Sequence, residues 1–178
     1  MRAIFEGFLA LTLFMPLGHA ENAITFSPAL PRPWTQVSSQ IVPATNPISQ
    51  SPLTTHITVV ENATNLQSMM ISVIPQVPAD AATNHLAVDA SNWLRGVLNG
   101  IPENHATQVS KFAVKTEKKQ QVVEASFTVQ LRDAVLCGTS RYSISNTNAI
   151  GWVAFGPDPS IETNKVVLRI AASIRVRK

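Results

Sequence analysis

The sequence predicts an α+β fold in a single domain, with an antiparallel β-sheet packed against one long central helix and a second, C-terminal helix. Three patterns predict it. Residues 123–131 alternate between apolar and polar side chains, as in a strand with one buried face. Apolar residues recur at three- and four-residue steps between 79 and 99, as in an amphipathic helix. Polar clusters separate the other apolar segments, as in antiparallel hairpins.

The first twenty residues have the features of a cleavable export signal. Arg2 supplies a positive charge, residues 8–17 form an apolar run, and small residues precede an expected cleavage between Ala20 and Glu21. The run is shorter than the about 20 residues that span a bilayer. The residue directly after the cleavage point is Glu21, whereas a lipoprotein would require a cysteine there. The mature chain, 21–178, is therefore expected to be periplasmic or secreted, with no transmembrane anchor.

Six prolines fall between residues 28 and 52. Because proline has no amide hydrogen, such a density excludes a helix or a central strand. We therefore expect a long exposed loop over about 28–53. Trp34 lies in this loop, where an aromatic side chain either pins the loop to the core or contacts a partner. We treat it as a candidate partner-binding residue.

A hairpin and the main helix are expected next. Residues 56–60 and 69–74 are rich in β-branched and apolar side chains, and the polar cluster 61–65 between them is typical of a turn. The helix is expected over 79–99, followed by a glycine and a proline that stop it. Trp93 lies on the apolar face of this helix and is expected to anchor it to the core.

A second hairpin is expected to end in a basic tip. A short alternation at 112–114 precedes the long alternating strand, and the polar stretch 116–121 joins them. Lys115, Lys118 and Lys119 gather at this tip and are candidate residues for binding an acidic partner. Nucleic acid is not expected as the partner, because the tip lacks the exposed aromatic residues on which bases stack.

The rest of the chain is expected to form two strands and a mixed tail. Residues 134–145 and 150–155 have strand-like patterns. The tail alternates like a strand but also fits a helical stripe. Asp158 before a proline is typical of a helix start. We therefore expect a helix over 159–172 and a short strand over 173–177.

Charge is distributed unevenly. Residues 21–100 contain two basic and four acidic residues, for a net charge of −2, whereas residues 101–178 contain eleven and six, for a net charge of +5. Charges spread over a sheet are usually a solvated face. The alternative is that the basic half attracts an acidic partner or anionic lipid headgroups.

No motif in the sequence specifies a reaction. The histidines lack the spacing of metal ligands, and neither a nucleophile elbow nor a phosphate-binding loop occurs. Cys137 is the only cysteine, so no intramolecular disulfide forms. Its place in a strand predicts a small buried hydrophobe, with a nucleophile as the alternative. The sequence leaves open a catalytic pair of carboxylates for glycoside hydrolysis, because its two members can lie far apart in the chain. We expect no catalytic, metal-binding or cofactor-binding residues.

The order of the predicted strands and helices is similar to that of a known domain family. A short strand at 24–26 precedes residues 30–34, in which two prolines lead to a tryptophan. A hairpin, one long helix, antiparallel strands and a late helix follow, and residues 173–176 close the chain. This succession resembles the PsbP/DcrB-like domain family. The resemblance implies an antiparallel sheet flanked by helices, and members that are mostly binding or assembly factors, in bacteria within the cell envelope or as adaptors for secreted proteins.

The chain departs from that family in its longer proline-rich stretch after Trp34. Together, the absence of catalytic motifs and the export signal predict a non-enzymatic binding or assembly module of the cell envelope that recognises a protein or an envelope component, without a cofactor. The alternatives are a small exported hydrolase or transferase with scattered catalytic residues, Cys137 among them, and a secreted factor directed at a host.

Overall fold

The computed structural model describes residues 24–26, 29–45, 52–75, 85–102, 104–117, 120–145 and 148–176. The strands are β1 (Ile24–Phe26), β2 (Thr35–Thr45), β3 (Pro52–Asn62), β4 (Gln67–Ile74), β5 (Ala106–Val109), β6 (Ala113–Glu117), β7 (Gln120–Gln130), β8 (Val135–Ser145), β9 (Asn148–Gly156) and β10 (Ile174–Val176). The helices are α3 (Leu86–Asn99), α4 (Lys165–Ser173) and the short 3₁₀ helix η1 (Pro159–Thr163). None of the described helices is long and apolar enough to cross a bilayer.

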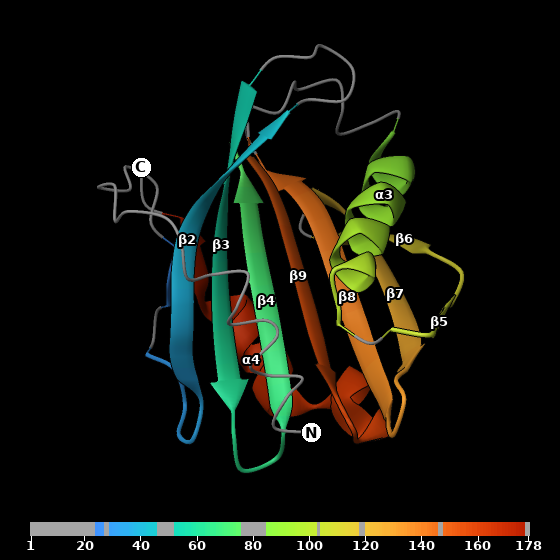
Figure 1. Cartoon of the computed structure of the whole chain (residues 1–178). Helices are drawn as coiled ribbons and strands as arrows, with labels where there is room; N and C mark the ends of the chain where they lie inside the picture. Colours follow the sequence, from blue (N-terminus) through green and yellow to red (C-terminus); the bar gives the residue numbers. More distant parts are fainter. Residues whose placement is uncertain are drawn as a thin grey trace.

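The strands confirm the predicted antiparallel sheet. Eight of them form one sheet in the order β2-β3-β4-β9-β8-β7-β5, with β6 also paired to β7 (Figure 1). β5 pairs with the end of β7 at 127–130, and β6 with its beginning at 120–124. β1 and β10 form a separate two-stranded sheet, which brings two segments from opposite ends of the described chain side by side.

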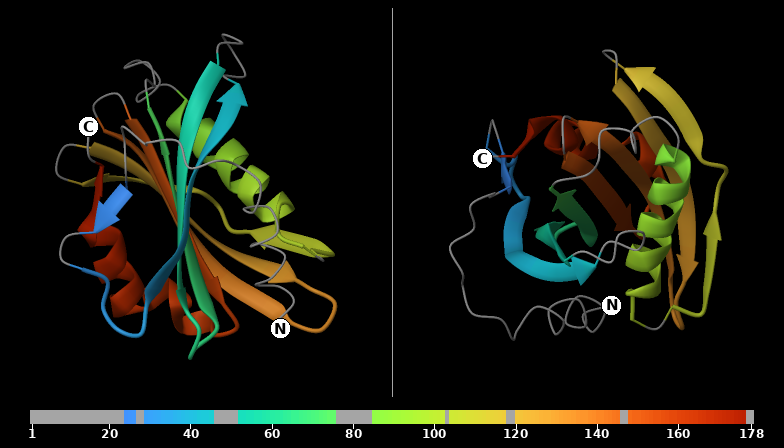
Figure 2. Two further views of the ribbon diagram at one scale, coloured as in Figure 1. Left: turned by 60° about the vertical axis from the view of Figure 1, so that its left-hand side comes forward. Right: turned by 90° about the horizontal axis from the view of Figure 1, so that it is seen from above.

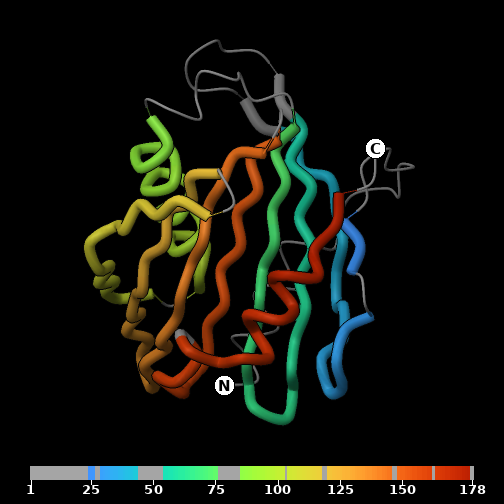
Figure 3. Tube along the Cα trace, turned by 180° about the vertical axis from the view of Figure 1, so that it is seen from behind, coloured from blue at the N-terminus to red at the C-terminus, as the bar shows by residue number. Residues whose placement is uncertain are grey.

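The two α-helices cover opposite faces of the sheet. α3 lies across the front face in Figure 1, and the view from behind shows α4 running diagonally across the other face (Figures 2 and 3). Successive side chains of β9 point to opposite faces of the sheet. Val153 and Phe155 belong to the core beneath α3, whereas Trp152 and Ala154 belong to the core beneath α4. The central strands are therefore buried on both faces.

Helix α3 packs through a regular apolar stripe. Its buried residues are Leu86, Ala90, Leu94 and Leu98, each four residues from the next. Helix α3 begins at Leu86, and residues 79–84 of the predicted helix lie outside the described residues. Its end at Asn99 agrees with the predicted stop.

The tail is a helix and a strand, as predicted, but the helix is interrupted. The side chain of Asp158 accepts a hydrogen bond from the Ser160 amide at 2.8 Å and starts η1. Asn164 is extended and ends this turn, and its Oδ1 accepts from the amide of Val166 at 2.9 Å, which caps α4. The predicted continuous helix was wrong because the extended backbone at Asn164 breaks it, and α4 starts from a second cap.

The proline-rich segment is not the loop that we expected. Residues Thr35–Thr45 form β2, which pairs along its whole length with β3 and lies at the edge of the sheet. An edge strand tolerates Pro43 because it has only one neighbour to which its backbone must donate. Pro52 is the first residue of β3, another position that proline tolerates. The prolines therefore excluded less than the sequence suggested, because they left an edge strand possible and Pro52 begins the central strand β3.

Two smaller expectations also change. Cys137 is half-buried rather than fully buried, and it packs at the margin of the core beneath α4. β5 was not predicted from the sequence. It is a short strand with exposed residues, so its pattern lacks a buried face.

Candidate functional site

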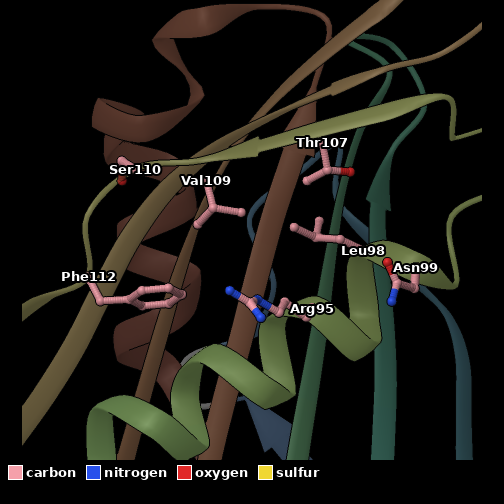
Figure 4. Close-up of a pocket in the computed structure, with 7 residues that line it drawn as sticks. All are labelled: Arg95, Leu98, Asn99, Thr107, Val109, Ser110 and Phe112. Atoms are coloured by element: carbon pink, nitrogen blue, oxygen red, sulfur yellow. The ribbon is translucent and has the colours of Figure 1, made fainter.

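A pocket opens where the second half of α3 faces β5. Its volume is about 310 Å³. Its walls come from α3, from β5 and from the connection between β5 and β6 (Figure 4). The lining residues are Arg95, Leu98, Asn99, Thr107, Val109, Ser110 and Phe112.

Hydrogen bonds hold the two walls of the pocket together. Asn104 lies between α3 and β5, and its Nδ2 donates to the carbonyl of Leu98 at 3.0 Å and to Thr107 Oγ1 at 2.8 Å. The amide of His105 donates to the carbonyl of Gln130 at 2.9 Å, which attaches the same connection to β7. These hydrogen bonds therefore fix the distance between α3 and β5 without a bound ligand.

Ser110 closes the pocket at the point where β5 gives way to β6. Its amide donates to the carbonyl of Ser126 at 2.8 Å, and its Oγ accepts from the amide of Ser126 at 2.9 Å. Because the oxygen acts as an acceptor in this pair, the hydroxyl hydrogen is available to a ligand. No second partner of this hydroxyl occurs in the described part of the chain.

The floor of the pocket is apolar. Leu98 is 1% exposed and belongs to the core beneath α3, and Val109 and Phe112 pack against that core as partly buried residues. Arg95, Asn99, Thr107 and Ser110 are exposed and form a polar rim. The pocket can therefore contact both the apolar stem and the polar end of a bound group.

Arg95 is the charged group of this rim. In Figure 4 its guanidinium extends across the pocket toward Phe112. Arg95 makes no ion pair or hydrogen bond with any described residue, and neither Asp nor Glu lines the pocket. A guanidinium is permanently charged and offers a planar fork of donors that matches a carboxylate or a phosphate. The pocket is therefore electropositive and suited to an acidic group.

The arrangement lacks the features of a metal centre within the part of the chain that the structure describes. No group of three His, Cys, Asp or Glu side chains is close enough there to hold a metal ion. His105 is exposed in the connection that supports the pocket but does not line it. The described groups can bind and orient a ligand, and none is arranged as a nucleophile with its base.

The structure places Lys115 in an ion-pair cluster. Its Nζ binds Glu124 Oε2, and Arg141 bridges Glu117 at 2.7 Å and Glu124 at 3.4 Å. The hydrogen bond to Glu124 raises the pKa of Lys115. Two carboxylates thus balance two cations, and Lys115 offers less free charge to an acidic partner than the sequence suggested. Lys118 and Lys119 lie outside the described residues, as do Ala20 and Glu21 at the predicted cleavage point.

Trp34 is buried, with 4% of its surface exposed. Its amide donates to the carbonyl of Pro31 at 2.9 Å in a turn, and its ring packs in the core beneath α4. Of the two roles considered for this residue, the structure shows the pinning of its segment to the core. Trp34 and Lys115 do not line the α3–β5 pocket, so the predicted binding residues are not gathered there.

Sequence reasoning missed the pocket residues. Arg95 lies on the polar side of a helix, where an arginine is ordinary, and Thr107 and Ser110 belong to a segment in which no strand was predicted. No strong signal was present, because residues 106–110 show no strict alternation of apolar and polar side chains.

Comparison with known proteins shows similarity in fold alone. No protein family and no curated protein matches the chain by sequence. Among solved structures, the chain is similar to the solution structure of cyanobacterial PsbP (CyanoP) from Synechocystis sp. PCC 6803, with a TM-score of 0.56 and 12% sequence identity. The match covers 93% of this chain and 99% of that chain. The chain therefore has a PsbP-like fold, as the resemblance in the order of its segments implied.

Proposed function

We propose that this protein is an exported, non-enzymatic binding module that recognises a protein or another component of the cell envelope through the α3–β5 pocket. The observation that carries the proposal is Arg95, a guanidinium without a described partner, placed over an apolar floor. The bound feature is an acidic group on a short apolar stem. The PsbP-like fold and the predicted export signal support the class of protein and its compartment.

The size of the pocket favours recognition of part of a larger partner. Its volume of about 310 Å³ lies at the lower end of the range for ligand sites, which is about 300–1,000 Å³. A side chain or a chain terminus fits such a space. The Ser110 hydroxyl supplies a second donor beside the guanidinium, whereas the Thr107 hydroxyl already donates to Asn104 Oδ1 at 3.1 Å. An acidic oxygen can therefore be held by both Arg95 and Ser110.

The test compares capture from envelope extract by the wild-type protein, by Arg95→Gln and by a matched control, Arg132→Gln. Arg132 is exposed in the turn between β7 and β8 and does not line the pocket. Removing a charge-assisted hydrogen bond costs about 1.5–3 kcal/mol. We therefore expect the captured component to bind Arg95→Gln about 10- to 150-fold more weakly in calorimetry, and Arg132→Gln as tightly as the wild type.

The arms of this experiment separate the two kinds of partner. Protease treatment of the extract removes a protein partner and leaves a lipid or glycan component. Equal capture by Arg95→Gln and by the wild type would show that the pocket is not the binding site. Conversion of the captured component into a product would replace the binding function with the enzymatic alternative.

A further inference from the structure

The solvent face of α4 combines positive charge with exposed apolar residues. Val166 is 38% exposed and Leu168 is 47% exposed, although both are large aliphatic residues. Lys165 and Arg169 are exposed on the same helix, and Arg175 is exposed in β10 directly after it. We call these five residues the α4 patch.

The spacing gathers three of these residues, Lys165, Leu168 and Arg169, on one side of the helix, and Val166 lies at the flank of that side next to Arg169. Lys165, Leu168, Arg169 and Ala172 follow each other at three-, one- and three-residue steps, which is one face of an α-helix, and all four are exposed. The opposite face, with Val167 and Ile170, is fully buried against the sheet. The outward face is therefore held in place by the core beneath it.

The positive charge of the α4 patch is not balanced within α4 and β10 themselves. Residues 165–176 contain three cations and no Asp or Glu. None of the three forms an ion pair with a described residue. Arg175 donates from Nη1 to the carbonyls of Ala172 at 3.0 Å and Ile174 at 2.7 Å, which holds its guanidinium beside the end of α4. The lysine-bearing hairpin, in contrast, has its described charges paired.

Apolar surface continues beside the patch. Leu168 also lines a groove of about 440 Å³ between α4 and the sheet, together with Ala172 and with Ile150 and Trp152 of β9. The far side of this groove carries the paired Glu117 and Arg141, so its free charge is low. The net positive field in this region therefore comes from the α4 patch.

We infer that the α4 patch docks the protein onto an anionic lipid surface. Cations on a helix, with aliphatic side chains between them, match a layer of negative headgroups over an apolar interior. The headgroups neutralise the three cations, while Leu168, on the same side of the helix as Lys165 and Arg169, contacts the boundary with the acyl chains. This surface lies on the opposite face of the sheet from the α3–β5 pocket, so the inference does not depend on the proposed function.

The test is co-sedimentation of the full chain with vesicles of phosphatidylcholine alone or with about 30% phosphatidylglycerol. The measured quantity is the increase in binding due to the anionic lipid, because the apolar run at residues 8–17 would bind either vesicle. The variants are Lys165→Gln with Arg169→Gln, Leu168→Ser, and Arg132→Gln as the charge control. Each cation near an anionic surface contributes about fivefold to partitioning. We expect the increase in binding caused by phosphatidylglycerol to be about 25-fold smaller for the double variant than for the wild type. For Arg132→Gln it should equal that of the wild type.

The remaining measurements separate the apolar from the charge contribution to vesicle binding, and an anionic lipid from an acidic protein as the partner. Leu168→Ser is expected to weaken the binding that persists at high salt, where charge attraction is screened. Equal binding to both kinds of vesicle by the wild type would overturn the inference. Binding to polyglutamate without binding to anionic vesicles would assign the patch to an acidic protein instead. Loss of vesicle binding in Arg95→Gln, with the double variant unaffected, would move lipid recognition to the pocket.

Discussion

Trp93 on α3 donates a hydrogen bond from its indole Nε1 to Ser72 Oγ on β4 at 2.9 Å. The same serine donates to the carbonyl of Gly151 on β9 at 3.5 Å, and a side chain at Gly151 would collide with the Trp93 ring. The Trp93 and Tyr142 rings also lie 5.7 Å apart between centroids. These contacts fix the position of α3 on the sheet, and Arg95 follows Trp93 by only two residues. The Trp93 indole therefore fixes the position of the pocket wall on α3 relative to the core.

Ser72→Ala should therefore destabilise the protein. Ser72 is buried, and its removal leaves the indole N–H of Trp93 without its partner. We expect a loss of about 1 kcal/mol in the free energy of unfolding, measured by urea denaturation. Ser91→Ala on α3 is the control, because Ser91 makes no side-chain hydrogen bond in the described part, and its effect should stay within about 0.5 kcal/mol. Equal effects of the two substitutions would contradict the role of this bond.

Gly138 is required by close packing in the sheet. A Cβ at this position would lie 2.2 Å from Phe127 Cζ and 2.7 Å from the carbonyl oxygen of Ala154. We expect Gly138→Ala to lower the free energy of unfolding by about 1–3 kcal/mol, because the core must shift to accept it. Gly96→Ala is the matched control. Its Cβ would meet nothing within 4 Å, and alanine is the better helix former by about 1 kcal/mol. A neutral Gly138→Ala would refute this packing argument.

Tyr142 should ionise only at unusually high pH. Its burial, and then the negative charge of Asp89, raise its pKa to about 12 from 10.0. Above about pH 10 the unfolded chain loses this proton first, so the free energy of unfolding should fall as pH rises from 10 to 12. Tyr142 is the only tyrosine, so tyrosinate absorbance reports it directly. A midpoint at the ordinary value in the folded protein would show that the ring is solvated.

His56 should make the fold sensitive to mild acid. It is 6% exposed on β3, and burial lowers its pKa below the ordinary value of 6.5. As pH falls below 6.5, the unfolded chain takes up a proton that the folded chain resists, so the free energy of unfolding should decrease. Urea denaturation between neutral pH and about pH 5 measures this slope. His56→Gln should flatten it, and an unchanged slope in that variant would assign the dependence to other groups.

The sequence by itself determined which segments could form which elements. Local patterns sufficed for the hairpin at β3 and β4, for the alternation that became β7, and for the stripe from Leu86 to Leu98, because each pattern records one buried face. The predicted end of α3 was also correct, since a glycine and a proline act locally. Even the pinning role of Trp34 was among the readings that the sequence allowed.

Only the tertiary structure decided where these elements meet. The prolines of β2 are compatible with an edge strand, but whether a strand lies at an edge depends on its neighbours. β5 has no buried face, so it is a strand only because β7 pairs with it. Lys115 reads as a free cation until the pairing of β6 with β7 brings Glu124, the neighbour of Ala113 across the strands, diagonally within reach of its side chain. Arg95, Thr107 and Ser110 converge only when α3 docks beside β5. Such long-range pairings are set by the whole chain at once, and no local pattern of side chains records them.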